Sequence, residues 1–468
     1  MLSHLFPKHP QRRRIKIGAI AKDEAPYLID WVFHHFYFGF DEIEIRVNNT
    51  TDNTLEVLQA LHEVYGDKLQ YRVDDDTYAK CQKRGKSFQK TAYQHMLNRA
   101  RGDFSHLLFI DIDEYWTPAD LCTGIHGFVT SFGRPDDVGA IAFRWFYDAP
   151  DAETRAFDAL YQPQVALYRD AHVKTLYSLM HRPHRVTCHS GHLRSGHHFL
   201  ASGARFDDTS SDLQTTYRSR VSAAQMAVFG DNVDRAFLIH RAHRSETEYL
   251  ASLLRNRPYR GRTHEDIPLK ANRTGFVQTA ENIVTFTPPA DALADYQQAR
   301  AQLLARLPAG LLTKAKQSAM ERAARLMQML AEDPDLLRDY AFLFEGVQRE
   351  QIRSQVAAVQ RERVYGQVDE VTHDGTRLHV RGWFYRRGIS VSETDIRLGQ
   401  QPATGVTREA RPDVRHAHAS APLECGVQLQ FDWPANAGMM PALNVAGTPF
   451  ALPDNPAGEA PLKQAAGQ

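Results

Sequence analysis

The stretch IKIGAIAKDEAPYLIDWVFHHFYFGFDEIEIRV, from Ile15 to Val47, holds two short apolar runs on either side of a longer amphipathic one. IKIGAIA and EIEIRV are each the length of a buried strand. The run between them begins at Pro26 and ends at Gly39, which are common residues at the start and the end of a helix. A strand, a helix and a second strand in this order predict a βαβ unit.

The same alternation continues downstream. NNTTDNTLEVLQALHEVYG is typical of a turn that leads into a helix, KLQYRV of a strand, and KSFQKTAYQHMLNRARG of a further helix. HLLFIDID, residues 106–113, is the next predicted strand. We therefore expect a Rossmann-like α/β domain, with a mostly parallel sheet and helices on both faces.

Composition narrows the function classes. The chain has 468 residues, enough for a catalytic domain with smaller companions, and its 56 basic residues balance 56 acidic ones, so the net charge gives no indication of a nucleic-acid partner. The four cysteines lack CxxC spacing, which predicts neither a disulfide framework nor a cysteine zinc site. No secretory leader or membrane span is recognisable, so we expect a cytoplasmic protein, at most peripheral to a membrane.

FIDIDEYW, from Phe109 to Trp116, ends a predicted strand in three carboxylates. On a strand of period two, Asp111 and Asp113 share one face, and ligands of open α/β sheets bind at the carboxyl ends of the strands. Two neighbouring carboxylates repel unless a cation lies between them, and such oxygen ligands suit Mn²⁺ or Mg²⁺. The alternative is that these acids cap a turn or pair with arginines.

Other nucleotide and metal motifs are absent from the sequence. The glycine and glutamate spacing of an EF-hand does not follow Asp111, and Lys80 occupies the first glycine position of a Walker A motif around RGKS. No GxGxxG follows a predicted strand, which argues against a dinucleotide-dependent oxidoreductase.

Four stretches in order resemble one enzyme class. They are IAKDEAPYLIDWVFHHFYFGFDEIEIRVNNTTDNT, LLFIDIDEYW, VKTLYSLMHRPHRVTCHSGH and LIHRAHRSETEYLASLLRNR. Together they resemble GT-A-fold glycosyltransferases of the bacterial family-two-like group related to family ninety-two, over roughly Ile15 to Phe286. The resemblance implies transfer of a sugar from a nucleotide-diphosphate donor to a glycan or glycoconjugate acceptor, with the second stretch as the D-x-D metal motif.

The resemblance also implies roles for individual residues. Nucleotide-sugar contacts are expected from Asp23, Glu24, Asn48, Asn49, Asp111 and Lys174, and metal ligands from Asp111, Asp113 and His240. Glu114 would hold the metal through water or orient Asp113. Val47 stands where relatives often have an acidic residue. As alternatives, His240 is an ordinary strand-end residue and Lys174 a surface charge.

An inverting enzyme needs a carboxylate base for the acceptor hydroxyl. The candidates are Asp148, Asp207 and Asp208, and inversion itself is inferred from the resemblance alone. The stretch CHSGHLRSGHH holds Cys188, His189, His192, His197 and His198, which could bind zinc or line the acceptor side of a cleft.

The remaining sequence predicts further parts. FTPPADALADYQQARAQLLARL opens an Ala- and Arg-rich helical segment, whose apolar stripe suits packing on the catalytic domain, on a second copy of the chain or on a membrane surface. From Tyr365, short strands such as RLHVRGWFY and CGVQLQFDW predict a small β-sandwich, which resembles an accessory domain of bacterial polysaccharide glycosyltransferases. It could bind glycan through Trp383 or Tyr385, or serve as a scaffold.

We therefore expect a basic tail (1–14), a GT-A domain (15–288), a helical segment (289–364), a β-sandwich (365–454) and a disordered tail (455–468). The expected function is metal-dependent glycosyl transfer in bacterial surface-polysaccharide assembly. The alternatives are a metal-dependent nucleotidyl- or phosphotransferase and a non-catalytic carbohydrate-binding protein on the same fold.

Overall fold

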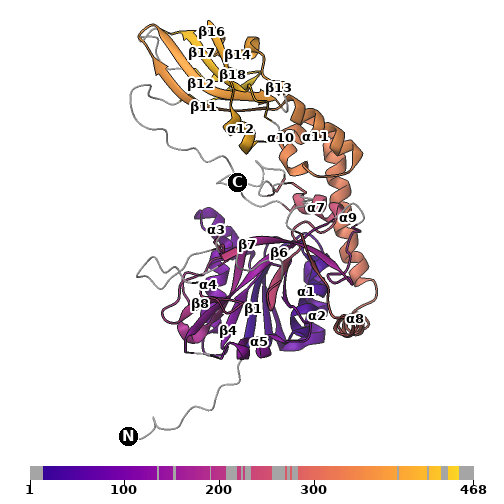
Figure 1. The fold of residues 1–468 in the computed structure, drawn as a ribbon. Coiled ribbons are helices and arrows are strands. Elements are labelled where there is room, and N and C mark those ends of the chain that lie inside the picture. Colours follow the sequence, from indigo (N-terminus) through magenta and orange to yellow (C-terminus); the bar gives the residue numbers. More distant parts are fainter. Residues whose placement is uncertain are drawn as a thin grey trace. The chain divides into compact units, whose positions relative to one another are not determined.

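The computed structural model describes residues 14–452 except 134–135, 151–153, 190, 207–218, 223–224, 227–232, 256–268, 271–272, 274, 277–282, 387–388, 419–420 and 434–440 (Figure 1). The chain divides into two compact units, Met1–Leu336 with Gly346–Gln348, and Leu337–Glu345 with Arg349–Gln468. The division falls within the helical segment expected over 289–364. Apart from Arg14, the two tails expected at 1–14 and 455–468 lie outside the described residues.

The first unit is built on one ten-stranded sheet in the order β3-β2-β1-β4-β7-β6-β9-β5, with β10 paired to β7 and β8 to β6. The strands are β1 (Ile15–Ala21), β2 (Glu42–Val47), β3 (Leu69–Val73), β4 (His106–Phe109), β5 (Glu114–Pro118), β6 (Val138–Asp148), β7 (Val165–Ser178), β8 (His197–Leu200), β9 (Ala236–His240) and β10 (Ile283–Phe286). Strands β3, β2, β1 and β4 are parallel, whereas β7 joins β4 antiparallel. The predicted α/β fold is confirmed, and antiparallel pairs that the sequence did not indicate extend it.

Helices cover both faces of this sheet (Figure 1). They are α1 (Ala25–Tyr37), α2 (Thr54–Tyr65), α3 (Asp75–Lys83), α4 (Phe88–Ala100), α5 (Ile125–Ser131), α7 (Glu246–Leu253), α8 (Ala290–Leu304) and α9 (Leu311–Glu332), with short 3₁₀ turns at Gly66–Lys68 and Leu179–His181. Strand β4 shows the two faces clearly: Leu107 and Phe109 join the core under α4, while Leu108 joins the core of α1 and α2. Both faces of the central strands are therefore buried, as their continuous apolar runs predicted.

The helices α8 and α9 belong to the first unit and pack on α1. Tyr296 of α8 lies 3.2 Å from His34, and Arg300 pairs with both oxygens of Asp30 at 2.6 and 3.0 Å. Part of the apolar stripe of the helical segment is thus covered by the chain's own first unit.

The second unit contains two antiparallel sheets, ordered β11-β12-β17-β16 with β13 at β12, and β15-β14-β18-β19. Its elements are η3 (Ala341–Phe344), α11 (Glu350–Glu362), β11 (Val364–His373), β12 (Arg377–Arg386), β13 (Ile389–Ser390), η4 (Glu393–Asp395), β14 (Ile396–Leu398), β15 (Gln401–Pro402), β16 (Gly405–Glu409), α12 (Pro412–Ala417), β17 (Gly426–Asp432), β18 (Leu443–Val445) and β19 (Thr448–Phe450); α10 (Pro334–Asp339) crosses the division. Val380, Leu429 and Leu443 are among the apolar side chains of one core shared by the two sheets. The predicted small β domain is confirmed.

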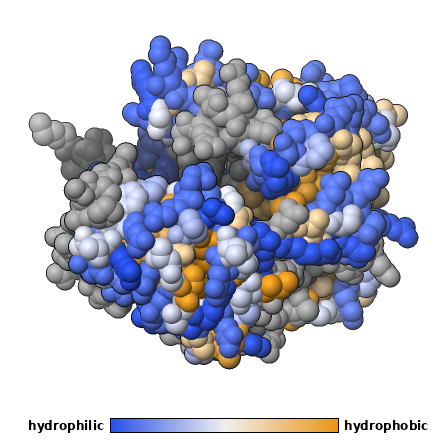
Figure 2. Space-filling view, turned by 90° about the horizontal axis from the view of Figure 1, so that it is seen from above, coloured by the Kyte–Doolittle hydropathy of each residue, from blue (hydrophilic) through white to orange (hydrophobic). Residues whose placement is uncertain are grey.

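The face in Figure 2 mixes extended hydrophilic areas with smaller groups of hydrophobic residues. Among the described residues, no helix combines the length and the apolar character that a membrane crossing needs.

The strand predicted over 106–113 is shorter than expected. Strand β4 ends at Phe109, and a turn leads into β5, where the Glu114 N–H donates to the Asp111 carbonyl at 3.0 Å. The indole Nε1–H of Trp31 in α1 donates to the carbonyls of both Asp111 and Glu114, at 3.0 and 2.9 Å. Because these carbonyls are used by the turn and by Trp31, and β4 ends at Phe109, the expectation that Asp111 and Asp113 share one face of a strand is wrong.

We predict that Trp31→Phe destabilises the first unit by about 1–3 kcal/mol more than Trp116→Phe, since two buried carbonyls lose their donor. Trp116 is a matched control: it is fully buried, but its indole nitrogen has no hydrogen-bond partner among the described residues. The comparison is made by urea unfolding. Equal destabilisation by the two variants would show that Trp31 acts by volume alone.

Candidate metal and phosphate site

The candidate site lies where β4 and β9 end and β5 begins. Strand β4 runs into the turn at Asp111, and β5 pairs antiparallel with β9 so that Glu114 stands opposite His240. Strand β6 pairs parallel with β9 and places Tyr147 opposite His240, one residue before Asp148. The sheet register therefore brings together residues that are far apart in the sequence.

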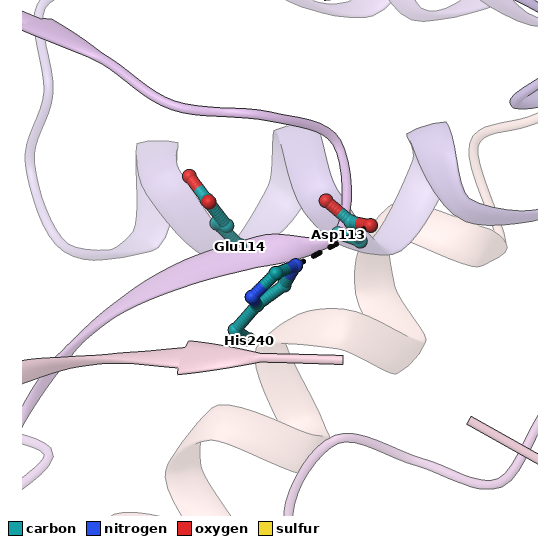
Figure 3. A group of neighbouring side chains, drawn as sticks. All are labelled: Asp113, Glu114 and His240. Carbon is teal, nitrogen blue, oxygen red and sulfur yellow. Dashed lines mark ion pairs between the residues drawn. The ribbon is translucent and has the colours of Figure 1, made fainter. Parts of the chain in front are cut away.

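Asp113, Glu114 and His240 form a group with the chemistry of a metal site. Each offers one ligand atom, and these atoms lie within 4.8 Å of one another (Figure 3). The Nε2 atom of His240 is 3.6 Å from Oδ2 of Asp113. The Glu114 Oε1 and His240 Nδ1 atoms are buried without a hydrogen-bond partner among the described residues. A divalent cation would satisfy such atoms, so these residues fit a metal ion.

Asp111 has different partners. Its Oδ2 atom accepts from the Lys174 ammonium at 2.9 Å, and its Oδ1 atom accepts from Gln89 at 3.1 Å and from the Tyr93 hydroxyl at 3.4 Å. The Lys174 nitrogen also lies 3.2 Å from the Glu114 carboxylate, whose Oε2 atom accepts the Asp111 N–H at 3.0 Å. Asp111 therefore stands beside the metal-binding group, linked to it through Lys174 and Glu114.

The charges of the site are mutually dependent. Burial alone would raise the pKa of Asp113, but the neighbouring His240 outweighs it, and Arg244 and Arg273 act in the same direction. The pKa of Asp113 is consequently held well below its usual range, and this carboxylate is ionised.

Glu114 and Lys174 form the buried core of the site. Burial raises the pKa of Glu114 well above its usual value, against the opposing effect of Lys174. Burial would lower the pKa of Lys174, but Asp111 and Glu114 outweigh it and raise the pKa well above its usual value. Lys174 is therefore a charged ammonium, 1% exposed, rather than the surface charge of the alternative interpretation.

The residues expected on the nucleotide side organise the loop after β2. The carboxylate of Asp23 accepts from the Thr51 N–H at 2.6 Å and from the Thr50 hydroxyl at 3.2 Å. The Asn49 N–H donates to Asp75, and Asp23 and Asn49 have φ angles of 54° and 45°. These two residues occupy the left-handed region that favours Asn and Asp among non-glycine residues.

Glu24 and Asn48 also lie in this region of the first unit. The Asn48 N–H donates to the carbonyl of Ala21 at 3.2 Å, and Glu24 pairs with the buried Arg255. Direct nucleotide contacts by Asp23, Glu24, Asn48 and Asn49 stay a prediction.

Two arginines near Asp113 were not among the predicted site residues. The Arg244 guanidinium is buried 3.3 Å from the centre of the Tyr27 ring, and its Nε and NH2 atoms have no hydrogen-bond partner among the described residues. The Arg273 guanidinium lies 3.8 Å from the Asp113 carboxylate. The sequence signal for Arg244 was the stretch HRAHRS, which begins at His240; Arg273 has no comparable signal.

Of the candidate bases, Asp148 is near the metal-binding group. Its Oδ2 atom accepts the backbone N–H of Arg244 at 3.0 Å and lies 3.7 Å from Arg241, while its Oδ1 atom is buried without a partner among the described residues. Burial raises the pKa of Asp148. It lines a cavity of about 280 Å³ together with residues that include Ile239 and Arg241. Asp207 and Asp208 lie outside the described residues.

The histidine-rich stretch 188–198 does not converge on one centre in the described part of the chain. The ring of His189 meets that of Trp145 edge to face, with ring centres 5.1 Å apart, His192 lies against His184, and His197 lies beside Arg205. The Trp145 ring in turn lies 4.3 Å from that of His240. His189 is thus the member of this stretch placed on the Trp145 side of the site.

Comparison with known proteins gives structural matches only. No protein-family model and no curated protein matches the chain. Among solved structures, the mannosyltransferase PcManGT from Pyrobaculum calidifontis in complex with GDP-Man and Mn²⁺ is similar at 13% identity and a TM-score of 0.26, over 75% of this chain and 85% of that one.

Two further solved structures are similar over shorter stretches. S. aureus TarS 1–349 in complex with UDP matches at 12% identity and a TM-score of 0.20, over 31% of this chain and 38% of that one. Glucosyl-3-phosphoglycerate synthase from Mycobacterium tuberculosis, in complex with Mn²⁺, UDP and phosphoglyceric acid, matches at 14% identity and a TM-score of 0.21, over 36% of this chain and 58% of that one. These TM-scores are low, so the site is interpreted from its own geometry.

We predict that Lys174→Met destabilises the first unit by about 3–5 kcal/mol, because it leaves a buried carboxylate without its cation. The double variant Lys174→Met/Glu114→Gln should regain most of that loss, since it removes the buried charge as well. Denaturant unfolding measures both. Lys90→Met, on the exposed side of α4, should change stability by less than about 0.5 kcal/mol. If the double variant were no more stable than the single one, the pairing of Lys174 with Glu114 would not be the stabilising interaction.

Proposed function

We propose that the first unit is a metal-dependent glycosyltransferase of the GT-A type, which moves a sugar from a nucleoside-diphosphate donor to a glycan or glycoconjugate acceptor. The observation that carries the proposal is the group Asp113, Glu114 and His240, which lies where β9 ends and β5 begins, next to guanidinium nitrogens of Arg244 that are buried without a hydrogen-bond partner among the described residues. A site for a metal ion beside a guanidinium group suits a diphosphate, because both can bind its negatively charged oxygens.

The metal ion would be held by Asp113, Glu114 and His240. An imidazole together with two carboxylates suits Mn²⁺ better than Mg²⁺, which favours oxygen ligands alone. When bound, the metal supplies Lewis-acid stabilisation of the negative charge on the leaving diphosphate.

The chain's own cations complete the charge balance. Departure of a nucleoside diphosphate places negative charge on its terminal phosphate, and fixed positive groups in a water-poor site stabilise that charge. Arg244 and Arg273 are in position for this role, because both act on Asp113 electrostatically and Arg273 lies 3.8 Å from it. Lys174 offsets part of the negative charge of Asp111 and Glu114, which reduces their repulsion of the donor.

Asp148 is the base candidate that the geometry supports. Its buried Oδ1 atom has no partner among the described residues, and its raised pKa favours proton uptake from an acceptor hydroxyl. A base in this place implies inversion at the anomeric carbon. We further propose a cytoplasmic enzyme of bacterial surface-polysaccharide assembly, with hexose as the transferred group.

We predict that one nucleoside diphosphate among UDP, GDP and CDP raises the melting temperature of the protein only when Mn²⁺ is present. At a ligand concentration a hundred times the Kd, the stabilisation is about 2.7 kcal/mol. Asp113→Ala should abolish the metal-dependent shift, and Asp111→Ala tests whether Asp111 is itself a metal ligand, as the sequence predicted. The measurement is differential scanning fluorimetry.

The matched control is Asp67→Ala, an exposed carboxylate on the 3₁₀ turn before β3, which should keep the full shift. A shift retained in Asp113→Ala would remove the metal assignment. No shift with any nucleotide would favour a carbohydrate-binding protein that lacks transferase activity.

We predict that Asp148→Asn keeps the Mn²⁺-dependent nucleotide binding but lowers the rate of sugar transfer by roughly 10²–10⁴-fold, the usual contribution of a general base. The rate is measured as nucleoside diphosphate released in the presence of acceptor, and NMR of the product reports the anomeric configuration. An unchanged rate, or retention of configuration, would exclude Asp148 as the base of an inverting reaction.

A further inference from the structure

A second cavity, of about 950 Å³, lies in the first unit at the opposite end of β4 from the turn with Asp111. It is lined by residues around the start of β4 (Ser105, His106), the end of β7 and the turn after it (Ser178, Leu179, Met180), and the end of α5 (Val129, Phe132). A cavity of this size is typical of a small-molecule site. None of the residues in the metal-binding group lines it, so it is a separate site.

The walls of this cavity have two kinds of surface. The apolar part consists of Phe104, Val129, Phe132, Val138, Ile141 and Leu179, with Met180 beside it at 58% exposure. The polar part includes three arginines, Arg101, Arg182 and Arg194, and the described lining residues include no Asp or Glu. Three cations without a carboxylate favour an anion, and the apolar wall favours a hydrophobic body attached to it.

The arginines are held at the cavity by fixed backbone contacts. His184 and His192 exchange backbone hydrogen bonds of 2.8 and 3.0 Å, which closes the segment between them and brings Arg182 and Arg194 to the same rim. The Arg194 N–H donates to the carbonyl of His181 at 3.0 Å. These contacts fix the backbone of Arg182 and Arg194 beside the cavity, whose lining includes both residues.

Two of these arginines have their charge available. Neither Arg182 nor Arg194 has an ion pair or side-chain hydrogen bond with another described residue, and both side chains are exposed. Arg101 donates to the carbonyl of Pro183 at 2.8 Å, which joins the end of α4 to the same rim. The Nδ1 atom of His184, also on the lining, is buried without a partner among the described residues. The cavity thus offers polar atoms that no described residue satisfies.

We propose that this cavity binds an amphipathic anion, an organic phosphate with an aliphatic or aromatic body. The apolar wall takes the hydrophobic part, and Arg182 and Arg194 hold the phosphate. Such a compound could be a free metabolite or the headgroup region of an anionic lipid, and the chemistry of recognition is the same for both.

The test uses decyl phosphate, below its aggregation concentration, as the probe in isothermal titration calorimetry on the full chain. Wild-type protein should bind it. Decanol, which lacks the phosphate, and inorganic phosphate, which lacks the apolar chain, should each bind at least about tenfold more weakly. Arg182→Glu/Arg194→Glu should weaken binding by at least about tenfold through lost charge-assisted hydrogen bonds. Arg185→Glu, exposed in the same segment but outside the lining, is the charge control.

A second pair of variants tests the cavity itself. Asn98→Trp, on the lining face of α4, should block the cavity and abolish binding, whereas His95→Trp, exposed on the same helix outside the lining, should not. Both positions are exposed, so the helix tolerates either change, and circular dichroism checks the folding of each variant. Equal binding by all variants, or no binding of decyl phosphate by wild type, would overturn the proposal.

The two sources are separated by co-sedimentation with vesicles. Arginine-dependent binding to phosphatidylglycerol but not phosphatidylcholine vesicles identifies a lipid headgroup, while binding of decyl phosphate alone identifies a free organic phosphate. Asp113→Ala should bind decyl phosphate as wild type does. Binding at this cavity is thereby tested separately from the transferase function, which is tested by metal-dependent nucleotide binding.

Discussion

The buried carboxylate of Glu114 is the constraint around which the first unit is organised. With no exposure, the Glu114 carboxyl group is strongly unfavourable as an anion unless a cation and hydrogen-bond donors accompany it. Lys174 from β7 provides the cation, the backbone of Asp111 provides a donor, and Trp31 from α1 fixes the carbonyls of the turn. Three elements that are distant in the sequence must therefore meet at one point, and the β4–β5 turn can form only when they do.

The parallel half of the fold could be predicted because its information is local. Strands β1 to β4 and helices α1, α2 and α4 follow from apolar runs bounded by Pro26, Gly39 and Gly66, and the structure places them close to those boundaries. The antiparallel half could not be predicted from the sequence, since the pairing of β5 with β9 joins residues separated by more than a hundred positions. The turn at 110–113 was missed because an apolar run hides it, and the deciding donor is the side chain of Trp31, far away in the chain.

For the candidate site, the sequence indicated the types of residue more fully than it indicated their positions. Asp113 and His240 were expected as metal ligands and are members of the group that could hold an ion. Glu114 was expected behind Asp113, yet the structure gives it a ligand atom of its own, and Asp111 is engaged by Lys174. Strand periodicity could not reveal this, because it fails once the residues leave the strand. Arg244 and Arg273 approach Asp113 only through tertiary packing.

The strand β7 has a consequence for folding specificity. Lys174, Leu176 and Ser178 alternate along it with Val173, Thr175 and Tyr177, and neighbouring strands fix their positions. A slip of one residue in either pairing would turn Lys174 to the opposite face and leave Glu114 buried without a counter-ion. The contact of Lys174 with Asp111 and Glu114 therefore favours the native sheet register, because a misaligned β7 would lose it.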